Sequence, residues 1–308
     1  MEGPGALFKK DFHLELAIFI DEVGSLWSTK TSDATRAFEP FFPELTGCAS
    51  LSSSRNGNTL LILTNSGEVI GLGDNKYGQL SGGMETYYKT PNPVFKLKNI
   101  KHISCTDKHM LALDIDGVVW GCGDNDNFYM GQGHPTIFTP KVIPDLPPMV
   151  TIYASNNAYA IDTSGKLWYW GFIYRVYGPK VINLPCFAVE IVECVEYGSV
   201  KISVLDIDDQ VWQAILPNLK DWVKVSPGKV IKMSKRRMKV EAEQLLLVDE
   251  NETVWLQNRN ALESYTIQSP VLDLIAGIDT ALHQLALPFT PLNLNLKNES
   301  KTKSARKG

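Results

Sequence analysis

A short pattern that returns six times along the chain constrains its fold more than any other feature. In each copy a polar turn is followed by valine or leucine and then by a large apolar residue. These anchor residues lie 43 to 50 positions apart and are Trp27, Ile70, Trp120, Trp168, Trp212 and Trp255. A period of this length is typical of repeat proteins, in which each unit buries its apolar face against its neighbours.

Each unit also carries a second apolar run in front of the turn, such as LLILT at 60–64 and MLALD at 110–114. Two such runs joined by Asp-Gly or Ser-Gly chemistry predict a β-hairpin. Further β-type segments with nearby proline precede most hairpins, and no stretch shows a sustained helical period with caps. The repeated all-β units therefore predict a β-propeller.

A seventh run at 283–296 comes at about the right distance but has lost the tryptophan and the turn glycine. Counted as a degenerate last copy, it predicts an all-β, seven-bladed propeller with about four strands in each blade. We expect the N- and C-terminal segments to share a blade and close the ring, which leaves no sheet edge open. The predicted domains are one propeller over 1–295 and a short, basic, disordered tail over 296–308.

Composition and charge narrow the class of protein further. The 308 residues are 44% hydrophobic and 21% charged, as in a soluble globular protein, and the net charge of -4 argues against a dedicated nucleic-acid binder. The five cysteines show no zinc spacing, and the N-terminal apolar run is broken by His13, Glu15 and Asp21. We therefore expect a cytoplasmic or nuclear protein that has no cofactor, no metal site and no membrane insertion.

Three central units resemble the regulator of chromosome condensation repeat. That repeat runs as a hydrophobic strand, a "cGxxHslaL" strand, a "DG" turn, a "vyswG" strand and a "NxyGQLG" loop followed by "TP". Segments 60–83 and 103–133 carry most of this pattern, Thr90-Pro91 and Thr139-Pro140 follow them, and 159–171 adds a third copy. The resemblance implies a seven-bladed propeller that is either a scaffold for protein partners or a guanine-nucleotide exchange factor for a Ran-type small GTPase.

The glycine-rich stretch from Gly67 to Gly83 looks like a phosphate-binding loop when it is read alone. A phosphate site of that kind needs a helix N-terminus directly afterwards, and a Walker loop also needs Lys-Ser or Lys-Thr. Neither feature follows here, and the glycines Gly71, Gly73 and Gly78 have counterparts in the next unit at Gly121, Gly123 and Gly131. The glycines are therefore predicted to serve the blade.

The loop tips GDNKYG at 73–78 and GDNDNFYMG at 123–131 allow two interpretations. Asp and Asn side chains bond to nearby backbone, so turn chemistry alone explains both Asp-Asn pairs. Loops on a propeller rim are also where partners dock, and exposed aromatic side chains are frequent anchors. The predicted partner-binding residues in these tips are Asp74, Asn75, Lys76, Tyr77, Asp124, Asn125, Phe128 and Tyr129.

The strongest local charge asymmetry is the basic run at 228–244, in which Lys235, Arg236 and Arg237 are adjacent. These three residues are predicted to bind an acidic partner surface, phosphates or an import receptor, and the alternative is a solvated turn in blade six. No Ser/His/Asp or Cys/His grouping forms a catalytic signature, so no catalytic residue is predicted. Nucleotide exchange needs no covalent chemistry. Exchange activity therefore stays an alternative to the leading hypothesis, which is a protein-interaction module.

Overall fold

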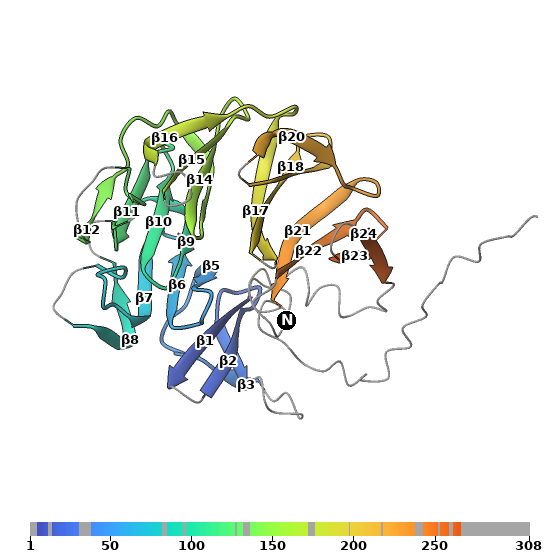
Figure 1. Ribbon diagram of the computed structural model, residues 1–308. Coiled ribbons are helices and arrows are strands. Elements are labelled where there is room, and N and C mark those ends of the chain that lie inside the picture. The colour runs from blue at the N-terminus through green and yellow to red at the C-terminus, as the bar shows by residue number, and fades with distance from the viewer. Residues whose placement is uncertain are drawn as a thin grey trace, which may run out of the picture.

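The computed structural model is built of strands and turns arranged around a common axis (Figure 1). It describes residues 5–11, 14–30, 38–81, 85–94, 97–126, 128–131, 136–171, 176–196, 198–216, 218–237, 243–251, 253–258 and 261–265. Within them, 24 strands form six antiparallel sheets of four strands each. This described part of the chain contains no helix long and apolar enough to cross a membrane.

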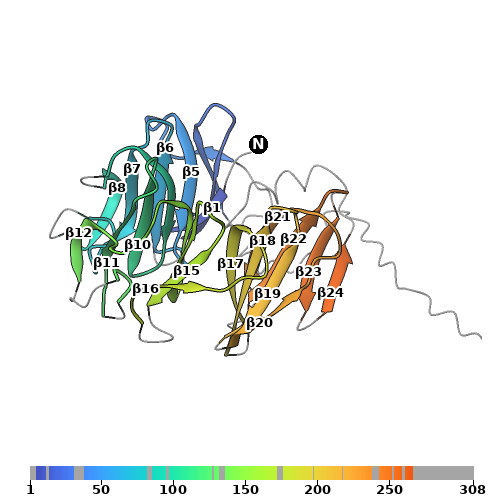
Figure 2. The same ribbon diagram turned by 90° about the horizontal axis from the view of Figure 1, so that it is seen from above.

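Each sheet is one blade, and its strands lie side by side in chain order (Figure 2). Blade 1 comprises β1 (Gly5–Asp11), β2 (Leu14–Ile20), β3 (Leu26–Lys30) and β4 (Glu39–Pro40); blade 2 comprises β5 (Cys48–Ser53), β6 (Thr59–Thr64), β7 (Val69–Asp74) and β8 (Tyr87–Pro93); blade 3 comprises β9 (Ile100–Cys105), β10 (His109–Asp114), β11 (Val119–Gly123) and β12 (Ile137–Val142). Blade 4 comprises β13 (Met149–Ala154), β14 (Asn157–Asp162), β15 (Leu167–Gly171) and β16 (Val176–Ile182); blade 5 comprises β17 (Ala188–Glu196), β18 (Ser199–Asp206), β19 (Val211–Ile215) and β20 (Asn218–Lys224); blade 6 comprises β21 (Val230–Arg237), β22 (Glu243–Asp249), β23 (Val254–Asn258) and β24 (Ala261–Tyr265).

The all-β propeller with four-stranded blades is confirmed, but the described residues form six blades rather than the predicted seven. The seventh copy at 283–296 and the tail at 296–308 lie outside those residues. Blade 1 takes all four of its strands from the N-terminal segment, with β1 paired to β2 from Gly5 and Phe19 to Asp11 and Leu14. Among the described residues, N-terminal strands alone therefore form the sheet of blade 1.

Burial on both faces explains the continuous apolar runs of the second strands. The first strand of each blade lies next to the first strand of the following blade, which places these strands around the axis. Every residue of β6 is buried, because Leu60 and Ile62 pack toward blade 1 while Leu61 and Leu63 pack toward blade 3. A strand enclosed in this way has no solvent face, so it needs no polar alternation.

A side-chain hydrogen bond closes the central hairpin in five of the six blades. In blade 4, Oδ1 of Asp162 accepts from the backbone N–H groups of Ser164 and Lys166, while Oδ2 accepts from the indole N–H of Trp168 at 2.8 Å. The same indole bond is made in four other pairs: Asp21 and Trp27, Asp114 and Trp120, Asp206 and Trp212, and Asp249 and Trp255. We call this arrangement the Asp-Trp clasp.

The clasp refines the role predicted for the repeated tryptophans. Four of them (Trp120, Trp168, Trp212 and Trp255) pack, partly buried, against the apolar clusters between adjacent blades, as expected for space-filling rings. Their indole N–H groups also tie each ring to its own turn. Blade 2 lacks the clasp because Thr64 and Ile70 replace the pair, and Thr64 Oγ1 instead accepts the Glu68 N–H at 3.0 Å and bonds with Ser66 Oγ at 2.8 Å.

Candidate functional site

The two Asp-Asn loop tips share one backbone construction. Asn75 follows β7 and its Oδ1 accepts the N–H of Leu80 at 2.8 Å; Asn125 follows β11 and its Oδ1 accepts the N–H of Met130 at 2.8 Å. Both asparagines are buried, at 3% and 1% exposure. Their side chains therefore stabilise the loops, as the turn-chemistry interpretation predicts, and are not available for contact with a partner.

The aspartates of the tips also bond to their own loops. Asp74 Oδ1 accepts the Lys76 N–H at 3.1 Å, and Asp124 Oδ1 accepts the Asp126 N–H at 3.0 Å. Asp124 is buried, whereas the Lys76 side chain is 66% exposed and lies 3.8 Å from Asp74 Oδ2. Lys76 therefore presents an accessible functional group, whereas the Asp124 side chain does not.

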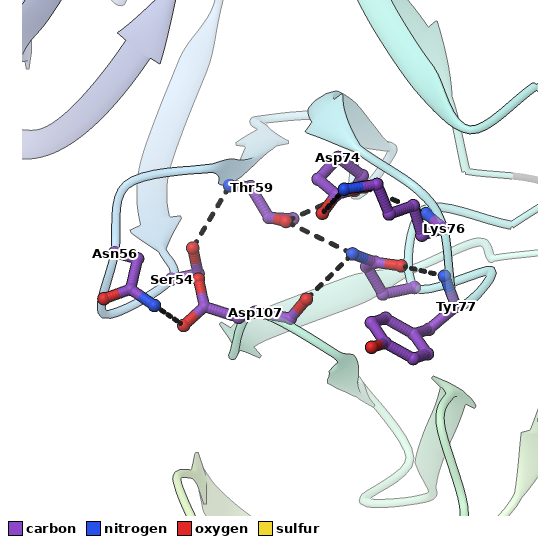
Figure 3. Close-up of polar contacts among 8 residues, drawn as sticks. Ser54, Asn56, Thr59, Asp74, Lys76, Tyr77 and Asp107 are labelled. Carbon is purple, nitrogen blue, oxygen red and sulfur yellow. Dashed lines mark hydrogen bonds and ion pairs between the residues drawn. The ribbon is translucent and has the colours of Figure 1, made fainter. Parts of the chain in front are cut away.

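A polar network joins the tip of blade 2 to blade 3 (Figure 3). The buried Gln79 amide donates to the backbone oxygen of Asp107 at 3.0 Å, and its Oε1 accepts the Tyr77 N–H at 3.0 Å. On the other side Asn56 Nδ2 donates to Asp107 Oδ2 at 2.7 Å (Figure 3). Asp107 Oδ1 is buried and has no hydrogen-bond partner. Through Gln79, this network holds the backbone of Tyr77 against blade 3.

Lys108 connects the two predicted loop tips. Its Nζ lies 5.1 Å from the centre of the Tyr77 ring and 3.5 Å from Asp124 Oδ2, and its backbone oxygen accepts the Asp124 N–H at 2.9 Å. A lysine held over an aromatic face and beside a carboxylate is attracted by both. Loops that are far apart in the sequence thus form one surface.

The aromatic residues of the tips are either half-buried or buried. Tyr77 and Phe128 are half-buried, whereas Tyr129 is 7% exposed and its ring stacks on His109 with centroids 4.0 Å apart. Phe138 of β12 is 55% exposed and packs against Gly78, next to Tyr77. A side chain at Gly78 would collide with Phe138, and the φ of 73° there also favours glycine.

Lys76, Tyr77, Lys108 and Phe138 therefore form one surface across blades 2 and 3, which we call the rim platform. Lys76 and Tyr77 were predicted from the sequence, whereas Lys108 and Phe138 were not. Nothing in the local pattern marks these two, because their role depends on contacts with a neighbouring loop. Asp107 and Gln79 were missed as well, although Gln79 stands in the "GQL" part of the repeat motif.

His109 is a packed core residue, as its place in the repeat motif suggests. Its Nδ1 lies 3.0 Å from Thr106 Oγ1, and its Nε2 is buried without a hydrogen-bond partner. Burial, aided by the nearby Lys108 charge, lowers the pKa of His109 to about 3. The imidazole is therefore neutral near pH 7 and is enclosed too well to exchange protons with a ligand. Among the described residues, no three His, Cys, Asp or Glu side chains gather as metal ligands would.

Within the basic run, the three predicted residues lie in strand β21, and residues 238–242 lie outside the described part of the chain. Lys235, Arg236 and Arg237 end β21, where they pair with Leu245, Gln244 and Glu243 of β22. The strand lies next to β17 of blade 5, so the run is far from the rim platform in the order of blades. Its three predicted residues are therefore not brought together with Tyr77.

The described residues form a β-propeller, and one stretch of it matches a known repeat family. Residues 100–128, from β9 to the second loop tip, match the family model of the Regulator of chromosome condensation (RCC1) repeat. The resemblance to this repeat, which was inferred from the sequence, is thus confirmed.

Curated relatives match part of this chain, and the matched stretch is a small share of their own length. Human E3 ubiquitin-protein ligase HERC2 is 31% identical over 124 residues, which are 38% of this chain but 2% of HERC2. Arabidopsis thaliana ultraviolet-B receptor UVR8 is 32% identical over 112 residues, which are 34% of this chain and 25% of UVR8. This chain therefore spans only a small part of these relatives.

Solved structures share the fold at lower identity. Human WBSCR16 superimposes with a TM-score of 0.60 at 16% identity, covering 80% of this chain and 74% of that one. Prp20p from Saccharomyces cerevisiae superimposes with a TM-score of 0.57 at 17% identity, covering 79% of this chain and 69% of that one. At such identities the likeness establishes architecture alone.

Proposed function

We propose that this protein is an interaction module that holds a protein partner on the rim platform of blades 2 and 3. The observation that carries the proposal is the double contact of Lys108 with the Tyr77 ring and Asp124, which joins two internally bonded loops into one pre-formed surface. A surface that is ordered before binding loses little conformational entropy when a partner docks. Exposed aromatic and cationic side chains on such a surface are typical binding anchors.

The test compares a double variant with a matched control from the same strand. Tyr77→Ala with Phe138→Ala removes both aromatic anchors, whereas Val142→Ala removes an apolar side chain of β12 that is 47% exposed. Tagged proteins of equal thermal stability are used to capture partners from cell extract, and the captured proteins are quantified by mass spectrometry. We expect specific partners to be retained by the wild type and the control and lost from the double variant. Identical capture by all three proteins would contradict the proposal.

A second candidate is guanine-nucleotide exchange on a Ran-type small GTPase. The observation that favours it is the shared fold with Prp20p, whose binding to Gsp1p and histones has been studied. Exchange requires a surface that prefers the nucleotide-free GTPase, and a rigid rim can supply such a surface without covalent chemistry.

Nucleotide release separates the two candidates. Small GTPases that include a Ran-type member are loaded with a fluorescent guanine nucleotide and mixed with catalytic amounts of the wild-type protein. Accelerated release that is abolished by Tyr77→Ala with Phe138→Ala supports exchange at the rim platform. Release at the intrinsic rate for every GTPase excludes the exchange function for that panel and leaves the interaction module.

A further inference from the structure

The outer edge of blade 5 differs from the outer edges of the blades before it. Each outermost strand has one side paired and one side free of any strand in the described part of the chain. The edges of blades 1 to 4 contain proline, and these residues are Pro40 in β4, Pro91 and Pro93 in β8, Pro140 in β12 and Pro179 in β16. Proline lacks an N–H group and protects an edge from pairing with another chain. β20 has no proline along its seven residues, and Figure 1 shows it on the outside of its blade.

The backbone of β20 has groups directed outward for further pairing. Val225 N–H donates to Val211 O at 2.8 Å, and Val223 pairs with Gln213 in the same ladder. Because N–H groups alternate in direction along an antiparallel strand, those of Trp222 and Lys224 point away from β19. An additional strand would meet these donors directly.

The side chains of β20 determine which side chains an added strand should carry. Lys220 and Lys224 are exposed, and Val223 is 60% exposed. The one acidic residue of the strand, Asp221, accepts a hydrogen bond from Asn218 and is thereby held locally. β24 of blade 6 also lacks proline, but it has five residues and contains Glu263 in place of lysines.

Two lysines on an open edge both exclude and select partners. A second copy of β20 would bring like charges together, which opposes self-association. An extended segment with acidic side chains would instead gain ion pairs together with main-chain hydrogen bonds. The half-buried Trp222 packs against the apolar cluster between blades 4 and 5, which anchors β20 to its blade, and its indole donates to Leu219 O within the same strand at 3.0 Å.

We propose that β20 is a docking edge where an acidic, extended segment of a protein partner adds a fifth strand to blade 5. This mode of recognition draws affinity from main-chain bonds and specificity from alternate side chains. The surface is separate from the rim platform, so it extends the proposed function to a second contact. One partner that uses both surfaces would bind with avidity.

The experiment titrates the full chain with a capped seven-residue peptide of alternating glutamate and valine. Two control peptides replace glutamate by lysine or carry N-methyl groups at alternate backbone positions. The protein variants are Lys220→Glu with Lys224→Glu, and the control Lys141→Glu, which reverses an exposed lysine on the proline-containing edge strand β12. Binding is followed by fluorescence anisotropy, and hydrogen exchange of the Trp222 and Lys224 amides reports the location.

We expect the acidic peptide to slow exchange of those two amides and the N-methylated peptide to leave them unchanged. The double reversal should weaken binding by roughly tenfold or more, since two attractive contacts become repulsive, whereas the Lys141→Glu protein should bind as the wild type does. The proposal is overturned if the acidic peptide, at a concentration on the order of 1 mM, leaves the Trp222 and Lys224 amides unprotected. It is also overturned if the N-methylated peptide binds equally well. Equal loss of binding in the Lys141→Glu control would also overturn it, because attraction would then depend on net charge alone.

Discussion

At the scale of single residues, several polar side chains of kinds that often occur in functional sites are buried and have structural roles. Thr59, His109 and Asn157 open the second strands of blades 2, 3 and 4, and each faces a glycine of positive φ across the sheet. All three are buried and hydrogen-bonded, Thr59 and His109 within their own blades and Asn157 to Glu193 of blade 5. Of these three residues, His109 is the one whose protonation should make the stability of the protein depend on pH.

The pKa of His109 predicts how stability depends on pH. The folded value is about 3, because burial disfavours the charged ring, whereas an unfolded histidine titrates near 6.5. The unfolded chain therefore binds the extra proton first, so stability is complete above pH 6.5 and declines as the pH falls toward the folded value. Between pH 7 and pH 5 this group should cost on the order of 2 kcal/mol.

Urea unfolding at pH 7 and pH 5 tests this expectation. His109→Phe keeps a ring against Tyr129 but cannot titrate, so its free energy of unfolding should change less between the two pH values. The control His102→Gln retains His109 and should show the pH-dependent loss of the wild type. A His109→Phe protein that loses as much stability as the control would argue against the buried neutral imidazole.

At the scale of the element, the Asp-Trp clasp holds the central hairpin in five of the six described blades. It is formed within seven consecutive residues, so each of these five blades can close its turn before it meets its neighbour. The bond also explains why tryptophan, and not another large apolar residue, recurs at this position, since only its ring offers an N–H donor. Blade 2, with Thr64 and Ile70, shows that packing can replace the clasp.

A double-mutant cycle in blade 4 measures the clasp. Trp168→Phe removes the indole donor while most of the ring stays, and we expect it to lower the free energy of unfolding by about 1 kcal/mol. Asp162→Asn keeps an oxygen for the backbone donors but directs an amide at the indole. In the Trp168→Phe background Asp162→Asn should cost clearly less than in the wild type, as measured by urea unfolding. Strictly additive costs would show that the two side chains are not coupled.

At the scale of the whole molecule, buried polar contacts join blades that the sequence shows only as separate repeats. Glu193 of β17 is 1% exposed and accepts hydrogen bonds from Tyr159 at 2.6 Å, Ser155 at 2.6 Å and Asn157 at 3.1 Å, all from blade 4. Burial and the nearby Glu193 raise the pKa of Tyr159, which keeps its hydroxyl protonated as a donor.

Substitution of Glu193 tests whether this contact holds blades 4 and 5 together. Glu193→Ala leaves three donors without their acceptor, two of them buried, and should lower the free energy of unfolding by roughly 2–4 kcal/mol. Glu193→Gln retains an oxygen for Tyr159 and Asn157 and an amide that can donate to Ser155, so it should stay within about 1 kcal/mol of the wild type. Chemical denaturation of the three proteins provides the comparison, and an equal loss in both variants would contradict this role.

Much of the fold could be predicted because its determinants are local. The six hairpins, their turns and their spacing depend on residues within a few positions of one another, and the repeat places them in one class of fold. Six blades are described where seven were predicted, and the seventh copy at 283–296 lies outside the described residues. Of the predicted loop-tip residues, Lys76 and Tyr77 lie on the rim platform, whereas Asn75, Asp124, Asn125 and Tyr129 proved to be buried.

The sequence by itself determined the propeller class, the hairpins and the loop tips, since each depends on short-range turn chemistry and on the periodicity of apolar residues. The tertiary structure alone decided that Lys108 meets both Tyr77 and Asp124, that Phe138 stands against Gly78, and that Glu193 reaches blade 4. These contacts join different strands and loops and leave no local pattern. They arise only when neighbouring sheets pack face to face around the axis.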